Sequence, residues 1–160
     1  MDIKILSSKA EGKTLTSAFD LALAKVGLQN YNLVRISSII PKDAKVIKAE
    51  KYENPDKKVG DILHVVISEK SSNVKGKIIT CGLGWILADE GGVFYEESHL
   101  DSSKEMVEKK LLEGLEDAKK IRSWRWTDEP KMKIEEHVVE ENGCVIVVAV
   151  YDLSARANHV

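Results

Sequence analysis

The sequence predicts a single α+β domain, on three observations. The chain has 160 residues, the size of one domain, and its 43% hydrophobic and 31% charged residues are typical of a globular protein. Two amphipathic segments are separated by several runs of β-forming residues, with mostly short connections. Sheets with one helix on each outer face would bury both apolar stripes. We expect residues 1–153 to form this domain and residues 154–160, which have little apolar content, to be a flexible tail.

The first part of the chain predicts one helix between strands. A strand is expected at Ile3–Leu6, followed by a polar loop over residues 8–14. Apolar residues then recur at helical spacing over residues 15–26, and Gly27 is typical of the residue that ends a helix. Residues 32–41 are rich in β-forming side chains and end in a proline, so they are predicted to be one mostly buried strand.

The second part predicts more strands around a second helix. Residues 42–58 are charged and contain proline, which favours a surface excursion. The predicted strands cover, in chain order, residues 62–67, 78–88, 93–95, 132–139 and 144–151, with a turn at Gly91–Gly92 before the third. Gly82 and Gly84 indicate a bulge or a close backbone approach. The buried stripe of the helix is expected to consist of Val107, Leu111, Leu115 and Ala118. The last two strands are predicted to form a hairpin around Asn142–Gly143.

Charge and hydropathy argue against several kinds of partner. A formal net charge of −2 gives no electrostatic reason to expect nucleic acid or an anionic membrane. No apolar run approaches the ~20 residues of a membrane span, and the N-terminus lacks a signal-peptide pattern. Cys81 and Cys144 form no CxxC motif, so we expect reduced thiols in a cytoplasmic protein, with a single disulfide as the alternative. The four histidines lack metal-ligand spacing, and no metal site is expected.

Two adjacent hydroxyls, Ser37 and Ser38, interrupt the apolar run of residues 32–41. A buried hydroxyl without a partner costs on the order of 1–3 kcal/mol. Each serine must therefore bond the neighbouring backbone, as serine commonly does, or take part in chemistry. An apolar strand with the amide donor Asn32 upstream distinguishes this pair from the other Ser-Ser pairs of the chain. The residues alone leave both interpretations open.

Several segments together resemble the pyruvoyl-dependent arginine decarboxylases. The resemblance is carried by residues 11–14, 18–20 and 32–41, and more weakly by residues 92–96, 136–137 and 143–144. The core Arg-Ile-Ser-Ser-Ile-x-Pro, residues 35–41, resembles the cleavage site of that family. The resemblance implies an αββα sandwich that assembles as a homotrimer, with active sites between protomers.

The resemblance also implies that the chain cleaves itself. Attack of the Ser38 hydroxyl on the carbonyl carbon of Ser37 would convert the amide to an ester, and elimination would then release Ser37 as a carboxylate. Hydrolysis of the dehydroalanine left at residue 38 would give an N-terminal pyruvoyl group. The products would be a β chain, residues 1–37, and an α chain, residues 38–160. Asn32 matches a family asparagine that assists processing, although asparagine is equally typical of a turn before a strand.

Catalysis would use the pyruvoyl group made from Ser38 as the covalent cofactor. Such a group supplies an electron sink, while protein side chains orient the substrate and return a proton. Glu96 matches the family's proton donor, a role that needs a carboxyl kept partly protonated by burial. From its residue type alone, Glu96 could equally be one of two solvated charges, with Glu97, at the end of a strand.

L-arginine is the substrate that the resemblance implies, converted to agmatine and CO₂ for polyamine biosynthesis. Asp20 matches the family's substrate-binding aspartate, and a carboxylate can hold a guanidinium in a bidentate pair. Leu23 and Ile39 are expected as apolar pocket walls, whereas Thr16 departs from a leucine of the family. Two alternatives stay open: a paralogue that acts on another amino acid, and an unprocessed, non-catalytic trimer that binds a small ligand.

Overall fold

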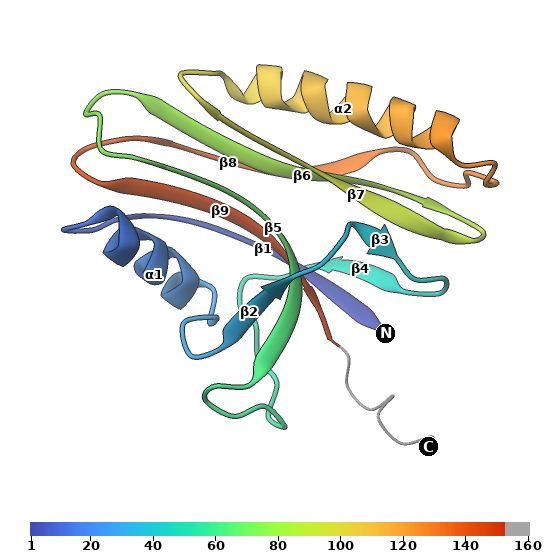
Figure 1. Ribbon diagram of the computed structural model, residues 1–160, viewed down its shortest axis with the longest axis horizontal. Helices are drawn as coiled ribbons and strands as arrows, with labels where there is room; N and C mark the ends of the chain where they lie inside the picture. The colour runs from blue at the N-terminus through green and yellow to red at the C-terminus, as the bar shows by residue number, and fades with distance from the viewer. Residues whose placement is uncertain (153–160) are drawn as a thin grey trace.

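The computed structural model describes residues 1–152, which form one domain of two β-sheets and two helices (Figure 1). In chain order the elements are β1 (Asp2–Glu11), α1 (Leu15–Lys25), β2 (Asn32–Arg35), β3 (Ile39–Ile40), β4 (Lys45–Lys48), β5 (Ile62–Ser72), β6 (Ile78–Ala88), β7 (Gly91–Leu100), α2 (Lys104–Ile121), β8 (Lys131–Val138) and β9 (Gly143–Tyr151). The predicted α+β class is confirmed. The predicted tail, residues 154–160, lies outside the described residues. Neither described helix is long and apolar enough to cross a membrane.

The larger sheet has five strands in the order β2-β5-β9-β1-β4 and is built around β9. β9 pairs antiparallel with β1 on one side and with β5 on the other, and all nine of its residues are buried. A strand covered on both faces needs apolar side chains at nearly every position, which explains the uninterrupted run Val145–Val150. β2 and β4 form the two edges and pair in parallel with β5 and β1.

The smaller sheet has four strands in the order β3-β7-β6-β8, and α2 packs against it. Gly82 and Gly84 leave room for this helix, because a Cβ on them would lie 3.1 Å from Leu111 and 3.2 Å from Leu115. The predicted close approach at these glycines is therefore confirmed. Helix α1 packs against the larger sheet. One apolar cluster has members from both sheets, among them Ile3, Ile5, Val66 and Val147 from the larger and Ile79, Leu83 and Phe94 from the smaller.

Both predicted helices are confirmed, and local chemistry sets their ends. The Thr14 side chain caps α1 by accepting a hydrogen bond from Ser17 N. Gly27, just after the helix, has a φ of 79°, a conformation that glycine adopts without the strain of a Cβ. The apolar stripe predicted for the second helix is buried in α2.

Two segments predicted as loops contain strand residues. β1 runs to Glu11, because residues 8–11 pair with β9 although their side chains are mostly polar. Residues 42–58, predicted as a surface excursion, include β4, which extends the sheet beside β1. The turn before β7 consists of residues 89–90, and Gly91 already belongs to the strand. In each case pairing with a neighbouring strand decides the structure, and local side chains do not indicate it.

The predicted terminal hairpin is wrong. β8 pairs with β6 in the smaller sheet, whereas β9 pairs with β1 and β5 in the larger sheet. Asn142–Gly143 therefore lead from one sheet to the other. The two strands differ in burial, since β8 is partly exposed along its length and β9 is buried throughout. Cys81 of β6 and Cys144 of β9 are buried and free, so the structure has no disulfide between them.

The single buried strand predicted over residues 32–41 is also wrong, and its correction defines the site. The segment forms two edge strands, β2 in the larger sheet and β3 in the smaller sheet, joined by Ile36–Ser38. Val34 and Ile39 are 41% and 42% exposed, because each lies at the edge of a sheet. Ser37 is exposed and Ser38 is half-buried. The two hydroxyls therefore lie in a crossing between sheets and not inside a strand.

Candidate active site

The crossing segment Ile36–Ser38 is fixed at both ends by backbone hydrogen bonds. Ile36 N donates to the Val65 carbonyl of β5 at 3.0 Å, and Phe94 N of β7 donates to the Ser38 carbonyl at 2.8 Å. The peptide bond between the two serines thus lies between anchors on different sheets. Each side of that bond keeps its own anchor if the bond is broken.

Ser38 stands at the centre of a tight turn. Ile39 N donates to the Ser37 carbonyl oxygen at 3.0 Å, which closes a three-residue turn. A donor on this oxygen would stabilise negative charge that develops when a nucleophile attacks the carbonyl carbon. The Tyr151 hydroxyl donates to the Ile39 carbonyl at 2.8 Å and holds the far side of the turn. Burial raises the pKa of Tyr151, which keeps the phenol a neutral donor.

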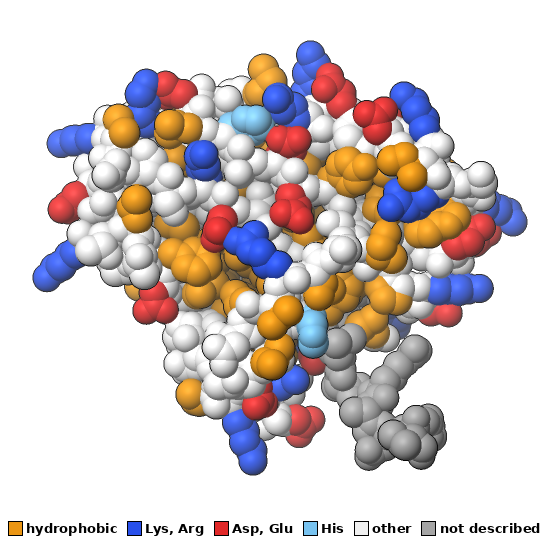
Figure 2. All heavy atoms as spheres, in the orientation of Figure 1, with side chains coloured by type: hydrophobic (Ala, Val, Ile, Leu, Met, Phe, Trp, Pro, Cys, Tyr) orange, Lys and Arg blue, Asp and Glu red, His pale blue; other side chains and the backbone are white. Residues whose placement is uncertain are grey.

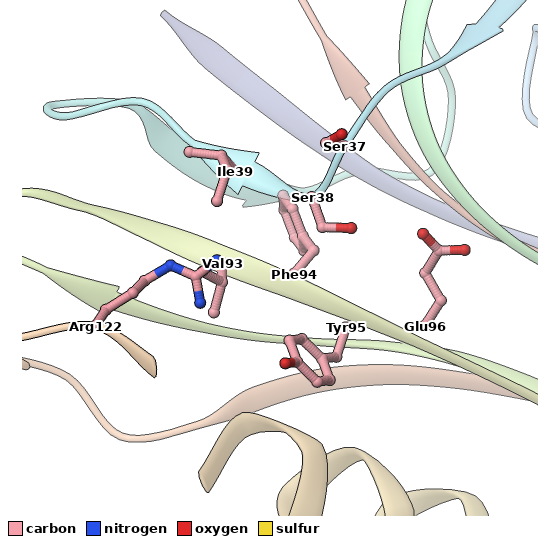
Figure 3. A pocket seen from close by; sticks show the side chains of 8 residues that line it. All are labelled: Ser37, Ser38, Ile39, Val93, Phe94, Tyr95, Glu96 and Arg122. Atoms are coloured by element: carbon pink, nitrogen blue, oxygen red, sulfur yellow. The ribbon is translucent and has the colours of Figure 1, made fainter. Parts of the chain in front are cut away.

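A cavity of about 560 Å³ lies beside the two serines. It is lined by Ser37, Ser38, Ile39, Val93, Phe94, Tyr95, Glu96 and Arg122 (Figure 3). Antiparallel pairing of Ile39 with Val93 sets β3 beside β7 and so brings the serines to this strand. Four residues predicted for the site, namely Ser37, Ser38, Ile39 and Glu96, therefore lie around one cavity.

Glu96 points toward Ser38 from the middle of β7 (Figure 3). Partial burial raises the pKa of its carboxyl, whereas the charge of Arg35 and a hydrogen bond with Ser38 lower it, and the net shift is upward. More of Glu96 is therefore protonated near neutral pH than of an ordinary glutamate. Glu96 lies within the strand and not at its end, but the residue is exposed in the single chain, so its role as proton donor stays a prediction.

A second cavity, also of about 560 Å³, is lined by residues of α1, β2 and β5 and contains two other predicted residues, Leu23 and Asn32. Leu23 is buried, and Asn32 Nδ2 donates to the Gly60 carbonyl at 2.8 Å. Asn32 precedes Ser37 by five residues, about 16 Å along an extended chain. Within one chain the Asn32 amide is therefore bound elsewhere, and its part in processing stays a prediction.

Asp20 is exposed on α1 and lines neither of these two cavities. A single chain therefore does not bring Asp20 together with Ser38 and Glu96. The substrate-binding roles of Asp20, Leu23 and Ile39 stay predictions.

Tyr95 and Arg122 line the cavity beside Ser38 without having been predicted. The Tyr95 ring lies against α2 at Gly114, where a Cβ would collide with it. Arg122 follows α2, and its guanidinium lies 5.4 Å from the Trp124 ring centroid, while Nη1 donates to the Ala118 carbonyl at 3.4 Å. Both positions depend on α2 folding back over β7. A basic residue at a helix end was the only sequence signal, and it is a common one.

His137, from the weaker part of the resemblance, makes a structural contact. Its Nε2 lies 2.6 Å from Glu11 Oε1, and Glu11 also accepts from Glu140 N and Glu141 N. Burial would raise the pKa of Glu11, but these hydrogen bonds outweigh it and lower the pKa. The cluster ties the end of β1 to the segment between β8 and β9. Across residues 1–152, no group of three or more histidine, cysteine, aspartate or glutamate side chains is arranged to hold a metal ion.

Known proteins are similar to this chain over nearly its whole length. A family model described as pyruvoyl-dependent arginine decarboxylase matches residues 2–155. A protein of that name from Thermococcus sibiricus is 35% identical over 148 residues, which cover 91% of this chain and 90% of the relative. The protein of that name from Pyrococcus furiosus is 34% identical over 151 residues, with 91% and 90% covered. The one from Methanothermobacter thermautotrophicus is 29% identical over 153 residues, with 94% and 96% covered.

Proposed function

The chain belongs to the family of pyruvoyl-dependent arginine decarboxylases, and from this premise we propose that it converts L-arginine to agmatine and CO₂ with a pyruvoyl group made from its own Ser38. The observation that carries the proposal is the setting of the Ser37–Ser38 bond. The bond crosses between two sheets, at a cavity that also contains Glu96, a carboxyl with a raised pKa. A serine pair with only a structural role would need neither the cavity nor a carboxyl with a raised pKa beside it.

Self-processing is supported by the turn around Ser38. Attack of Ser38 Oγ on the Ser37 carbonyl carbon breaks the amide and forms an ester, with the hydroxyl proton passing to the released amine. The Ile39 N–H on the carbonyl oxygen stabilises the charge that develops there. Loss of a proton from Cα and of the Ser37 carboxylate from Cβ leaves dehydroalanine at residue 38. Water then replaces its nitrogen, and ammonia and the pyruvoyl group result.

The two products would stay together without a covalent link. Residues 1–37 contribute β1, and β1 lies between β9 and β4, which both belong to residues 38–160. Ile3 and Leu6 of β1 have no exposed surface. Removing this strand would expose the centre of the larger sheet, and burial of one such side chain contributes roughly 1.5–3 kcal/mol. Cleavage therefore changes the chemistry at Ser38 and leaves the fold in place.

The residues beside Ser38 fit the pyruvoyl group and the reaction. When present, the group supplies the electron sink that makes loss of CO₂ from an amino acid accessible. Glu96 gives a proton to the carbon that has lost CO₂, and its raised pKa keeps that proton available. Val93 and Phe94 are buried apolar neighbours that limit water around the reacting carbon. Ile39 forms a further wall of the cavity.

The substrate guanidinium would be held by Asp20 of an adjacent protomer in a trimer of αββα sandwiches. The separation of Asp20 from the Ser38 cavity within one chain supports a shared site, because neither group alone completes it. The apolar side chains exposed on α1 and β2, Leu15, Leu21 and Val34, support contact with another copy. The two free buried thiols are consistent with a reducing compartment such as the cytoplasm.

Mass spectrometry and a substrate panel test this function together. Under denaturing conditions the purified protein should separate into residues 1–37 and residues 38–160, the latter blocked to Edman degradation. The cleaved protein should release CO₂ from arginine faster than from lysine, ornithine or other amino acids. Cleavage with release from another amino acid alone would assign a different substrate. A single unbroken chain with no decarboxylation would refute the proposal.

Substitution of Asp20 by alanine should weaken arginine use without preventing cleavage. Loss of a charge-assisted pair with a guanidinium removes roughly 1.5–3 kcal/mol, which raises KM about tenfold or more while kcat changes less. Steady-state kinetics measures KM and kcat separately, and mass spectrometry measures cleavage of the chain. Asp117→Ala, which removes another exposed helical aspartate, is the matched control and should leave KM unchanged. Equal KM values for Asp20→Ala and the parent would assign the guanidinium to another group.

Mixed trimers test whether sites form between protomers. Ser38→Ala and Asp20→Ala chains, each nearly inactive at low arginine concentration, should regain part of the activity when they are co-expressed. The gain is expected because a site can then combine Ser38 of one protomer with Asp20 of the other. Light scattering on the same sample should report a trimer. A mixture no more active than its separate components would place the complete site within one protomer.

A further inference from the structure

A third cavity, of about 460 Å³, lies where the edges of the two sheets meet, and it collects charged side chains. It is lined by Arg35, Ile67, Ser68, Glu69, Glu96, Glu97 and Ser98. Arg35 comes from β2, Glu69 from β5 and Glu96 from β7, so three strands of two sheets contribute. Figure 2, in the orientation of Figure 1, shows basic and acidic side chains side by side near the centre of the face that it draws. Glu96 lines both this cavity and the one beside Ser38.

Arg35 has two partners at one end of this cluster. Its Nη2 lies 2.6 Å from Glu69 Oε1, and Nη1 donates to the Ile67 carbonyl at 3.3 Å. The side chains of Arg35 and Glu69 are 55% and 37% exposed, so the pair is screened by water and is weak as a source of stability. The same guanidinium also acts on Glu96 through its charge. Arg35 is therefore paired with Glu69 and lines the same cavity as Glu96, which comes from a different strand.

We propose that Arg35 is a positioning residue that sets the pH at which Glu96 gives up its proton, and that Glu69 limits this effect by holding the guanidinium. The inference rests on the proposed function in one respect, namely that Glu96 is the proton donor. Arg35 belongs to residues 1–37 and both glutamates belong to residues 38–160. The three interacting side chains therefore come from both products of cleavage. The proposed role needs no contact between Arg35 and the substrate.

Maturation increases the importance of Arg35. In the uncleaved chain, burial raises the pKa of Glu96, while Arg35 and the Ser38 hydroxyl lower it. Conversion of Ser38 removes that hydroxyl and leaves Arg35 as the remaining group that favours the charged form. The other charged residues that line the two cavities beside Glu96 are Glu69 on β5, Glu97 on β7 and Arg122 after α2, with His99 hydrogen-bonded to Glu97 at 2.8 Å. Arg35 is the cation that lowers the pKa of Glu96.

The sign of the effect distinguishes this role from a structural one. A proton donor works in its protonated form, so activity falls as pH rises through the pKa of Glu96. Arg35→Gln raises that pKa and should move the falling limb to higher pH by about half a unit. Glu69→Gln frees the guanidinium to act more strongly on Glu96, so it should move the falling limb to lower pH. Arg35→Lys should keep most of the parent profile, because it keeps the charge.

The first experiment compares pH profiles of kcat for these variants with that of Lys70→Gln, which removes a cation from the same region of β5 outside the cavity. Opposite shifts for Arg35→Gln and Glu69→Gln, with no shift for Lys70→Gln, support the inference. Shifts in the same direction, or lower activity at every pH with an unmoved limb, contradict either the role of Arg35 or that of Glu96 as proton donor, and the second experiment separates these two. A changed pKa moves the falling limb along the pH axis, whereas a loss of folded protein lowers the activity at every pH.

A second experiment reads Glu96 directly and does not depend on the cofactor. Carbon NMR of glutamate-labelled Ser38→Ala protein follows the Glu96 carboxyl, identified by its loss in Glu96→Gln. The pKa of Glu96 should decrease in the order Arg35→Gln, parent, Glu69→Gln. An unchanged pKa in Arg35→Gln overturns the inference. The expected order in NMR without matching shifts in the pH profiles supports Arg35 as the residue that sets Glu96 and refutes Glu96 as the proton donor.

Discussion

Replacement of Ser38 by alanine should leave one intact chain and no measurable decarboxylation of arginine. Alanine has no oxygen to attack the Ser37 carbonyl, and it cannot become a pyruvoyl group. Both the cleavage and the cofactor therefore depend on this single side chain. Denaturing mass spectrometry should give the mass of the uncleaved chain, and release of CO₂ from labelled arginine should stay at the background level.

Ser37→Ala is the matched control for this result. Ser37 supplies only the carbonyl that is attacked, and its side chain is exposed. The Ser37→Ala chain should therefore still be cleaved before residue 38. Circular dichroism of both variants should match that of the parent, because neither substitution alters an anchor of the crossing segment. Cleavage of Ser38→Ala at the same bond would show that another nucleophile makes the cut.

Long segments with one clear periodicity were predictable from the sequence. The stripe of Val107, Leu111 and Leu115 gave α2, since its spacing can be satisfied only by a helix lying on an apolar surface. Sheet membership was not predictable in the same way. Residues 32–41 look like one mostly buried strand, because two short edge strands and the segment between them together have the composition of one long strand. Which strands pair is decided by contacts distant in sequence, and composition does not encode them.

The residues of the candidate site were likewise predictable only in part. Ser37, Ser38 and Glu96 could be named from the sequence because short motifs around them resemble a known family. Arg35 was part of that motif, but its role depends on Glu69 and Glu96 arriving from β5 and β7. Tyr95 and Arg122 depend on the return of α2 over the smaller sheet. Side chains that act through long-range packing leave no local pattern, so the structure was needed to find them.

Glu96→Gln should cleave normally but decarboxylate arginine about 10²–10⁴-fold more slowly, the usual contribution of a positioned general acid. Glutamine keeps the size of the side chain and can still hydrogen-bond Ser38, so the processing site is preserved. It has no acidic proton to give to the carbon that has lost CO₂. Mass spectrometry measures cleavage, and single-turnover release of agmatine measures the catalytic step.

The pH dependence makes the assignment of Glu96 specific. Because partial burial raises the pKa of its carboxyl, the protonated form persists to higher pH than in an ordinary glutamate. The rate of the parent enzyme should fall as pH rises through that pKa, whereas the residual rate of Glu96→Gln should not follow this limb. Glu108→Gln, at an exposed position of α2, makes the same charge change outside both cavities that Glu96 lines and should retain both the rate and the falling limb. Normal turnover by Glu96→Gln would require the proton to come from another group.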